Sequence, residues 1–361
     1  MEPVRVLDLG LVPPLRSQAI YHGIGYAMKP ETPDTLILVS PSDPYVCIGY
    51  HQELEKEVDV EYCGRVGLPV YRREVGGGAV YLDQGQLFTQ WAFKPGRLPA
   101  SIEGRFALYV RPLVETYRSL GIPANHRPVN DIHVHGKKIG GTGAAQMNQA
   151  ELVVGSLMFD FDFAMMARVL KVSSEKMRDK VRQSLDEYMT TLTRELGRTP
   201  DREQVKGEYL RHVASALGRP LEVGEPTPEE LAVTSEMERR LASDEWLHQK
   251  GGLKQTEAVK IHADVYVAES AYKAPGGLIR ATLRVREGRI DDLSLSGDFT
   301  LLPIGAVAAL EQALRGAPLD AAAVRTKVAA VYKARPLQSP GVRVEDWVEA
   351  VMAVTRQASP Q

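Results

Sequence analysis

The sequence predicts an α+β protein with mostly antiparallel sheets and a second, smaller α+β domain at its C-terminal end. Three observations lead to this prediction. Short apolar or alternating runs follow one another closely in the first half, with few helical segments between them. A polar helical stretch begins at Ser173, and a hairpin pattern followed by helical stretches closes the chain. The length of 361 residues suits two domains.

The expected strands of the first half are short runs of apolar residues bounded by glycine or turn residues. They cover Thr35–Ser40, Tyr45–Gly49, Pro69–Arg72, Ala79–Leu82, Leu87–Phe93, Asp131–Val134 and Leu152–Phe161. We interpret Asp83–Gln86 as the turn of a hairpin that pairs Ala79–Leu82 with Leu87–Phe93. Apolar residues at helical spacing predict a helix over Arg105–Leu120, which Gly121 ends.

The second half begins with helices. We expect one long polar helix over Glu175–Leu196, another over Asp201–Leu217, and a third that starts at Thr227-Pro228 and ends near Ala242. The later elements are a strand at Ala258–Ala268, a hairpin of Leu278–Val285 and Arg289–Leu295 around Glu287-Gly288, and helices near Pro303–Leu314, Asp320–Tyr332 and Val344–Val354. We place the boundary between Ala242 and Glu257, which gives domains of residues 1–245 and 255–361.

Composition and charge exclude several classes of protein. The formal net charge of -2 lacks the basic excess of a sequence-independent nucleic-acid binder. The N-terminus has no basic start, and Asp8, Pro13 and Pro14 interrupt its apolar stretch, unlike a secretion signal. No uncharged apolar window is long enough to cross a membrane. The only cysteines, Cys47 and Cys63, suit a reducing compartment. We therefore expect a cytoplasmic protein that binds neither nucleic acid nor membrane. We also expect a monomer, although these observations do not bear on the oligomeric state.

A glycine run, Gly76-Gly77-Gly78, follows two arginines, Arg72 and Arg73. Three glycines remove every side chain from a short piece of backbone, so that a ligand can reach the main-chain N–H groups. The arginines supply positive charge suited to phosphate. Taken alone, the same residues are also typical of a glycine-rich turn with two solvated arginines, which is the alternative interpretation.

A second polar stretch runs from Asn130 to Gly143 and includes Asp131 and Lys138 on either side of a turn at His135-Gly136. A hairpin there would bring the acid and the lysine onto neighbouring strands. The lysine could then hold a carboxylate or phosphate, and the aspartate could hold Mg²⁺. An exposed turn with charged flanks is the alternative. His133 shares a predicted strand face with His135, but a metal site would need a third ligand that the sequence does not reveal.

Together the two stretches read RRxxGGGAVYxDxGxLxxxxxF and NDIxxxGKKIxG, a combination that resembles the lipoate–protein ligase family. The resemblance implies a catalytic domain of the biotin/lipoate ligase fold. It implies that Lys138 is catalytic and reaches the acid's carboxylate and the α-phosphate of ATP, and that Asp131 lies by the phosphates and the magnesium ion. The residues implied to bind substrate or adenylate are Arg72, Gly76, Gly77, Gly78, Ala79, Asn130, Asp131, Gly141, Thr142, Gly155 and Ser156. Gly155 and Ser156 match the strand beside the lipoyl tail.

The second half resembles the C-terminal accessory domain of large bacterial members of this family. The matching stretches are Trp246 to Gly252 and the hairpin around Glu287-Gly288. The accessory domain is implied to assist activation of the acid and to move between the two steps. Three positions depart from the family pattern: Gln86 replaces an asparagine, Val154 a histidine, and Gly140–Gly143 a serine-containing segment. These departures concern the substrate tail and the acceptor more than the reaction.

The resemblance implies ATP-dependent joining of lipoate, or octanoate, to a lysine of an acceptor protein. ATP, Mg²⁺ and lipoate are the implied cofactors and substrates. The acceptor would be a lipoyl domain, a glycine-cleavage-H-like protein or a dedicated lipoate-binding protein. Three alternatives remain. An octanoyl or lipoyl transferase would need a cysteine downstream of Lys138, where the chain has none. A biotin ligase would carry a different loop in place of Gly76–Gly78. A lipoate-binding protein without activity would retain the motifs but not the turnover.

Overall fold

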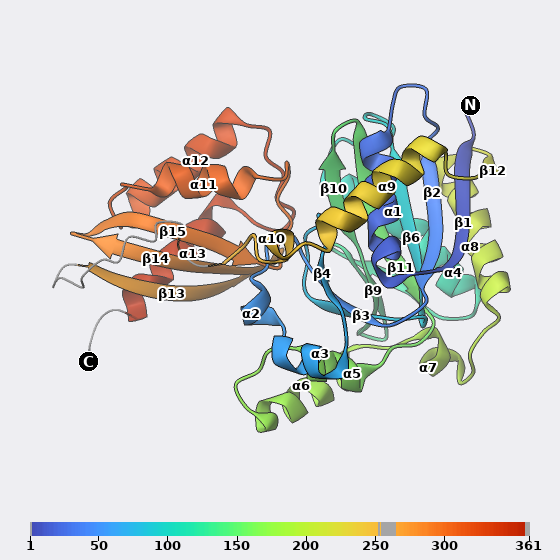
Figure 1. Ribbon diagram of the computed structural model, residues 1–361, viewed down its shortest axis with the longest axis horizontal. Helices are drawn as coiled ribbons and strands as arrows, with labels where there is room; N and C mark the ends of the chain where they lie inside the picture. The colour runs from blue at the N-terminus through green and yellow to red at the C-terminus, as the bar shows by residue number, and fades with distance from the viewer. Residues whose placement is uncertain (1, 252, 254–264, 358–361) are drawn as a thin grey trace. The chain divides into compact units, whose positions relative to one another are not determined.

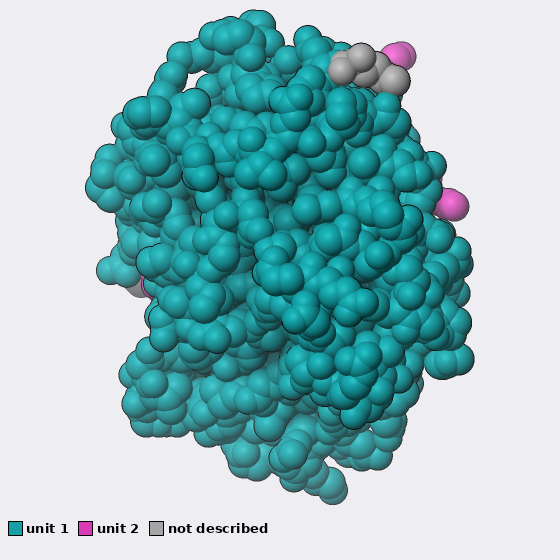
Figure 2. Space-filling model, turned by 90° about the vertical axis from the view of Figure 1, so that its right-hand side faces the viewer, with its two compact units in different colours: residues 1–48, 55–75, 79–247 teal, residues 49–54, 76–78, 248–361 magenta. Residues whose placement is uncertain are grey.

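The computed structural model describes residues 2–251, 253 and 265–357, which fall into two compact units (Figure 1). The first unit, drawn in teal in Figure 2, holds the chain up to Ile48 together with Glu55–Val75 and Ala79–Leu247. The second unit holds Gly49–Leu54, Gly76–Gly78 and the chain from His248 onward. None of the described helices is both long and apolar enough to span a membrane.

A six-stranded mixed sheet forms the centre of the first unit, in the order β10-β11-β6-β2-β1-β12. The pairs β10–β11, β11–β6 and β2–β6 are antiparallel, whereas β1 pairs in parallel with β2 and β12. The strands are β1 (Val4–Val12), β2 (Thr35–Pro41), β6 (Gln86–Phe93), β10 (Gly143–Met147), β11 (Ala150–Met158) and β12 (Leu221–Val223). The predicted fold class, α+β with mostly antiparallel pairing, is confirmed.

One face of this sheet is covered by α1 (Pro14–Ala27), and α9 (Pro228–Leu241) packs against α1 (Figure 1). The two helices approach closely because Gly23 has no side chain. A Cβ atom there would lie 2.1 Å from Oγ1 of Thr234. The helix α9 begins at Thr227-Pro228, as predicted, and its start also has a capping box formed by Thr227 and Glu230.

The opposite face of the sheet is covered by α4 (Ile102–Ser119), with α8 (Arg202–Leu217) packed beside it. Their tyrosines meet Trp91 of β6. Tyr109 makes an edge-on ring contact with this tryptophan at 5.0 Å, and the Trp91 Nε1–H donates to the hydroxyl of Tyr209 at 3.0 Å. Buried aromatic residues with partnered polar atoms therefore join this helical layer to the sheet.

Two three-stranded sheets complete the strands of the first unit. They are formed by β4 (Val70–Arg72), β3 (Tyr45–Ile48) and β5 (Val80–Leu82), and by β7 (Asn125–Arg127), β8 (Asp131–Val134) and β9 (Lys137–Gly141). The predicted hairpin between Ala79–Leu82 and Leu87–Phe93 is wrong, because β5 pairs with β3 while β6 joins the large sheet. Residues 83–85 cross between sheets, and the carbonyl of Gly85 accepts bonds from the N–H groups of Phe159 and Asp160.

The long helix predicted over Glu175–Leu196 is also wrong. It is divided into α6 (Glu175–Tyr188) and α7 (Leu192–Leu196). The interruption is stabilised at both of its ends: the Thr190 N–H donates to the carbonyl of Lys138, and the Thr191 hydroxyl caps α7. The remaining helices are α2 (Leu54–Glu57), α3 (Val60–Val66), α5 (Phe163–Val169) and α10 (Asp244–Leu247).

The second unit contains an antiparallel sheet of β13 (Val265–Ala274), β14 (Gly277–Arg286) and β15 (Arg289–Gly297). The hairpin predicted at Glu287-Gly288 is confirmed, and both residues have positive φ (48° and 70°). The helices α11 (Ala306–Leu314), α12 (Ala321–Ala334) and α13 (Val344–Gln357) follow, and Trp347 lies in the core of this unit. Of the strand expected at Ala258–Ala268, residues 258–264 lie outside the described residues, as does residue 255, the expected start of this domain.

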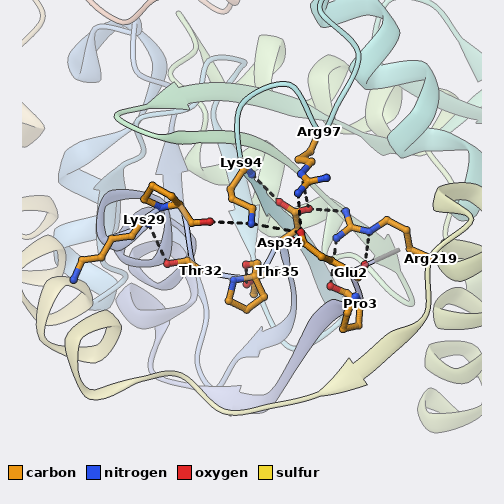
Figure 3. A network of polar contacts seen from close by, with 11 residues as sticks. Glu2, Pro3, Lys29, Thr32, Asp34, Thr35, Lys94, Arg97 and Arg219 are labelled. Carbon is orange, nitrogen blue, oxygen red and sulfur yellow. Dashed lines mark hydrogen bonds and ion pairs between the residues drawn. The ribbon is translucent and has the colours of Figure 1, made fainter.

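A buried carboxylate, Asp34, links chain segments at the ends of the central strands β2 and β6 in the first unit (Figure 3). Asp34 is fully buried and accepts from Nη1 of Arg219 at 2.5 Å and from the N–H of Lys94 at 2.8 Å. The guanidinium of Arg97 lies 3.9 Å from the same carboxylate. This network joins the loops before β2 and after β6 to Arg219, the second residue after α8.

Candidate active site

The hairpin of β8 and β9 brings Lys138 and Asp131 together, as the sequence predicted. The two strands are antiparallel, and the turn residues His135 and Gly136 have φ values of 49° and 82°. Nζ of Lys138 lies 2.7 Å from Oδ1 of Asp131. The side chains are 39% and 30% exposed, so this ion pair can be reached by a ligand.

Gly141 leaves the space that this ion pair occupies. A Cβ atom on Gly141 would lie 3.1 Å from both Cε and Nζ of Lys138, and 3.4 Å from Oδ1 of Asp131. Those distances are tight, and the atom that would move is the flexible end of the lysine. Gly141 therefore leaves room for the ammonium group, which a side chain at this position would displace.

Gly141→Ala is expected to slow acyl-adenylate formation about tenfold while leaving thermal stability almost unchanged, because it displaces the Lys138 ammonium without disturbing the backbone. Pyrophosphate release and the melting temperature measure the two effects. Gly140→Ala is the matched control, since its nearest neighbour, Cδ1 of Ile132, would be at an ordinary 3.4 Å. Equal loss of activity in both variants would contradict the role given to Gly141.

Asn130 and Thr142 hydrogen-bond to each other across the end of the hairpin opposite its turn. The Asn130 side-chain amide donates to the carbonyl of Thr142 at 2.5 Å. In return, the N–H and the hydroxyl of Thr142 donate to the carbonyl of Asn130 at 2.9 and 3.1 Å. The two residues thus hold β8 and β9 in register beside Asp131, and their side chains are used within the hairpin.

Two residues that the sequence analysis did not single out hold the backbone around Lys138. Thr190, at the break between α6 and α7, bonds the carbonyl of Lys138 at 2.9 Å. The hydroxyl of Tyr117 donates to the carbonyl of Ile139 at 3.4 Å and accepts from the N–H of Met158 at 3.2 Å. The sequence did contain a signal for the helix break at which Thr190 lies. Threonine favours helix N-caps, so the pair Thr190-Thr191 ahead of Leu192 could have indicated the start of a new helix.

Gly155 and Ser156 lie on β11, next to the hairpin. A Cβ atom on Gly155 would lie 2.9 Å from the carbonyl oxygen of Gly141, so the glycine lets the two strands approach. Ser156 is paired with Phe88 of β6. The structure thus brings Gly155 to Lys138's hairpin and places Ser156 on the large sheet.

Arg72 is fully buried at the end of β4 and is used inside the first unit. Its Nε donates to the carbonyl of Trp246 at 3.1 Å, and its Nη2 donates to the carbonyl of Leu247 at 2.6 Å. In return, the indole N–H of Trp246 donates to the carbonyl of Arg72 at 2.9 Å. Arg72 therefore holds α10, and contact with an adenylate would require its guanidinium to exchange these partners.

A buried polar cluster supports the residues that follow Arg72. The N–H of Glu74 donates to Nε2 of His22 at 3.1 Å, and the hydroxyl of Tyr26 donates to the Glu74 carboxylate at 2.6 Å. Burial lowers the pKa of His22 to about 3, so its ring is neutral near pH 7 and accepts this bond. Burial raises the pKa of Glu74, which also pairs with Arg240 of α9 at 2.8 Å.

The glycine run itself belongs to the second unit by its contacts, whereas Ala79 belongs to the first. A Cβ atom on Gly76 would lie 2.8 Å from the carbonyl oxygen of Phe299, and Gly77 has a φ of 94°. Both positions therefore require glycine for reasons of backbone packing and conformation. Asp131, Lys138 and Gly141 therefore all belong to the first unit, whereas Gly76–Gly78 belong to the second.

The histidines of the hairpin do not form a metal pair. His135 lies in the turn with positive φ, and not on the strand face of His133 as the sequence suggested. No group of three or more His, Cys, Asp or Glu residues within the described ranges could hold a metal ion by itself. A single carboxylate such as Asp131 fits Mg²⁺, which takes its other ligands from phosphate and water.

Comparison with known families and structures agrees with this geometry. Residues 14–214 match the family model described as the lipoyl protein ligase A/B catalytic domain, and residues 266–336 match the bacterial lipoate protein ligase C-terminus. The first match covers more than half of the chain. The protein therefore belongs to the lipoyl protein ligase A/B family and has the two-domain architecture of its larger bacterial members. The family resemblance is confirmed.

Individual relatives differ in their reaction. Octanoyltransferase LipM of Kyrpidia tusciae is 30% identical over an alignment of 246 residues, and the match covers 61% of this chain and 89% of LipM. Lipoate-protein ligase LplJ of Bacillus subtilis is 26% identical over 296 residues, 81% of this chain and 84% of LplJ. The protein thus belongs to an enzyme family that includes both ligases and octanoyltransferases.

Two solved structures have the same fold. A bipartite lipoate protein ligase from Thermoplasma acidophilum, described with its E2 lipoyl domain, is 28% identical with a TM-score of 0.63, covering 72% of this chain and 100% of that one. A lipoate-protein ligase A bound with ATP is 26% identical with a TM-score of 0.60, covering 69% and 99%.

Proposed function

We propose that the protein is an ATP-dependent ligase that joins a lipoic-type acid to a lysine of an acceptor protein. The observation that carries this proposal is the accessible ion pair of Lys138 and Asp131, with Gly141 keeping space for the ammonium. A lysine in this position offers a compact positive charge to a carboxylate and a phosphate at the same time. The ATP complex of a related ligase supports the use of ATP.

The reaction proceeds in two steps. In the first, a carboxylate oxygen of the acid attacks the α-phosphate of ATP, the bond to the β-phosphate oxygen breaks, and pyrophosphate leaves. In the second, the neutral amine of the acceptor lysine attacks the acyl carbonyl, AMP leaves, and the amine loses a proton. Lys138 orients the carboxylate and stabilises the charge on the α-phosphate, and later stabilises the oxyanion and the departing AMP. Mg²⁺ beside Asp131 would neutralise phosphate charge.

The remaining site residues have supporting roles in this proposal. Asn130 and Thr142 hold the hairpin in register, and Gly155 lets β11 approach it. Ser156 lies beside the tail of the acid. From the family resemblance we propose that Ala79 and the glycine run Gly76–Gly78 line the adenylate, and that Arg72 does so once its guanidinium leaves the carbonyls of Trp246 and Leu247. The C-terminal domain assists activation and moves between the two steps.

Octanoyl transfer is the second candidate, because LipM octanoyltransferases are among the relatives. Transfer through a thioester requires an accessible thiolate. Both cysteines are buried: burial raises the pKa of Cys47, and raises that of Cys63 to about 11. Both also precede Lys138 in the sequence. These thiols are poorly suited to act as nucleophiles, which supports the ligase.

The acceptor in this proposal is a lipoyl domain, since the related Thermoplasma ligase is described with its E2 lipoyl domain. A glycine-cleavage-H-like protein or a dedicated lipoate-binding protein presents its lysine on a comparable small domain. We propose that the enzyme acts on such an acceptor as a monomer in the cytoplasm.

The proposal predicts an ATP-dependent gain of one lipoyl group by a lipoyl-acceptor domain, detected by mass spectrometry in the presence of Mg²⁺-ATP and free lipoate. An ATP-free reaction supplied with an octanoyl thioester is the control. Modification only in that control would establish the transferase instead. Pyrophosphate release without acceptor modification would show that the acid is activated and that another acceptor is needed, whereas no signal in any reaction would favour a binding protein.

A further inference from the structure

The amide of Gln86, at the start of β6, is buried without using its hydrogen-bonding groups. The residue is 1% exposed. Among the residues that the structure describes, neither Nε2 nor Oε1 of Gln86 has a hydrogen-bond partner. Its backbone, by contrast, is fully used: the N–H donates to the carbonyl of Asp83, and the carbonyl accepts from the hydroxyl of Ser40 at 2.7 Å.

An unpartnered buried amide is costly in a folded protein, because the group has lost its water without a replacement. Such groups are rare and require an explanation. A bound ligand that supplies the missing partner would recover this energy. Gln86 is therefore expected to face a ligand that carries a donor or an acceptor.

The strand register shows which surface Gln86 shares. Directly opposite residues of an antiparallel pair lie on one face, and so do alternate residues of a strand. Gln86 is opposite Met158, and Phe88 is opposite Ser156, so these four residues share one face of the large sheet. Gln90, on the same face, donates to the carbonyl of Ser17 at 2.8 Å, which identifies it as the face covered by α1.

The neighbours of Gln86 on this face suit sulfur. Met158 and Phe88 are buried, apolar and polarisable, and sulfur interacts favourably with aromatic rings. A saturated hydrocarbon tail in contact with these side chains would leave the amide unpartnered. The sulfur atoms of a dithiolane would accept a hydrogen bond from Nε2, and the thiols of its reduced form would also donate to Oε1.

We propose that Gln86 determines which acid the enzyme selects, favouring a sulfur-bearing tail over a plain alkyl chain of the same length. This inference rests on the proposed function, in which Ser156 lies beside the tail of the acid. Discrimination arises because the amide is satisfied by one tail and left unpartnered by the other.

The test compares lipoate, octanoate and 8-hydroxyoctanoate with the full chain, by calorimetric binding and by the kcat/KM of pyrophosphate release. The wild-type protein is expected to prefer lipoate to octanoate about tenfold. 8-Hydroxyoctanoate, which offers both a donor and an acceptor, is expected to bind better than octanoate. Gln86→Leu is expected to bring all three acids to similar affinity, mainly by weakening lipoate, and to raise the melting temperature by removing the unpartnered amide.

Two further variants keep the test decisive. Gln90→Leu makes the same chemical change two positions along the same face and should preserve the preference, although it loses the bond to Ser17. Gln86→Met has the length of glutamine and should behave like Gln86→Leu. An unchanged ratio of affinities in both Gln86 variants, or an equal loss for every acid, would overturn the inference. Absence of pyrophosphate release by wild type would refute the ligase, while the binding ratios still test Gln86.

Discussion

Lys138→Ala is expected to reduce acyl-adenylate formation by about 10²–10³-fold or more, because it removes the charge that orients the carboxylate and stabilises the α-phosphate. The ion pair with Asp131 at 2.7 Å is partly exposed, so its loss should change stability little. Initial rates of magnesium-dependent pyrophosphate release, measured with a saturating acid, give the effect on activation. The transfer step can be measured separately by supplying the acyl-adenylate.

Lys137→Ala is the matched control. Lys137 is an exposed lysine on the same strand, adjacent in sequence, and successive residues of a strand point to opposite faces. Its replacement should leave pyrophosphate release within about twofold of wild type, since surface charges at a distance are screened by salt. Similar losses in the two variants would show that the hairpin needs positive charge in general and not Lys138 in particular.

The second large effect is expected on stability and not on activity. Asp34→Ala should lower the free energy of unfolding by about 3–5 kcal/mol, because it leaves the Arg219 guanidinium and the Lys94 N–H without their buried acceptor (Figure 3). Urea unfolding of the full chain, followed by circular dichroism, measures this change. The partners of the Asp34 carboxylate are Lys94, Arg97 and Arg219, none of which belongs to the Lys138 hairpin, so activity per folded molecule should be retained.

Glu2→Ala is the control within the same network. Glu2 pairs with Arg97 at 2.7 Å, but its side chain is 62% exposed and that of Arg97 is 44% exposed. An exposed ion pair of this kind contributes less than about 1 kcal/mol. A loss as small as this for Asp34→Ala would mean that Arg219 finds another partner when the carboxylate is removed.

Much of the local structure follows from the sequence alone. The hairpin that joins Asp131 to Lys138 was predicted because a glycine turn separates two short runs, and such turns have few conformations. The same reasoning predicted the hairpin at Glu287-Gly288, and a proline followed by two acids after Thr227 predicted the start of α9. In each case the information lies within a few residues, so the pattern is sufficient.

Predictions that depended on distant parts of the chain were wrong. The strands β5 (Val80–Leu82) and β6 (Gln86–Phe93) are consecutive and have a short connection, yet β5 pairs with β3, and β6 pairs with β2 and β11. The helical pattern over Glu175–Leu196 continues through Thr190, but a backbone bond to Lys138 competes with helix formation there. The local spacing of apolar residues does not show which strand a given strand will pair with. It also does not show that a backbone group will bond to a remote strand.

The sequence by itself thus determined the family, the fold class and the residues of the Lys138 hairpin, because these depend on residue types at fixed short spacings. Only the tertiary structure decided that Gly141 leaves room for the ammonium of Lys138, that Arg72 donates to the carbonyls of α10, and that the amide of Gln86 is buried without a hydrogen-bond partner among the described residues. The reason is physical: a side chain's burial and its hydrogen-bond partners depend on residues brought close by folding, and most of those lie far away in the chain.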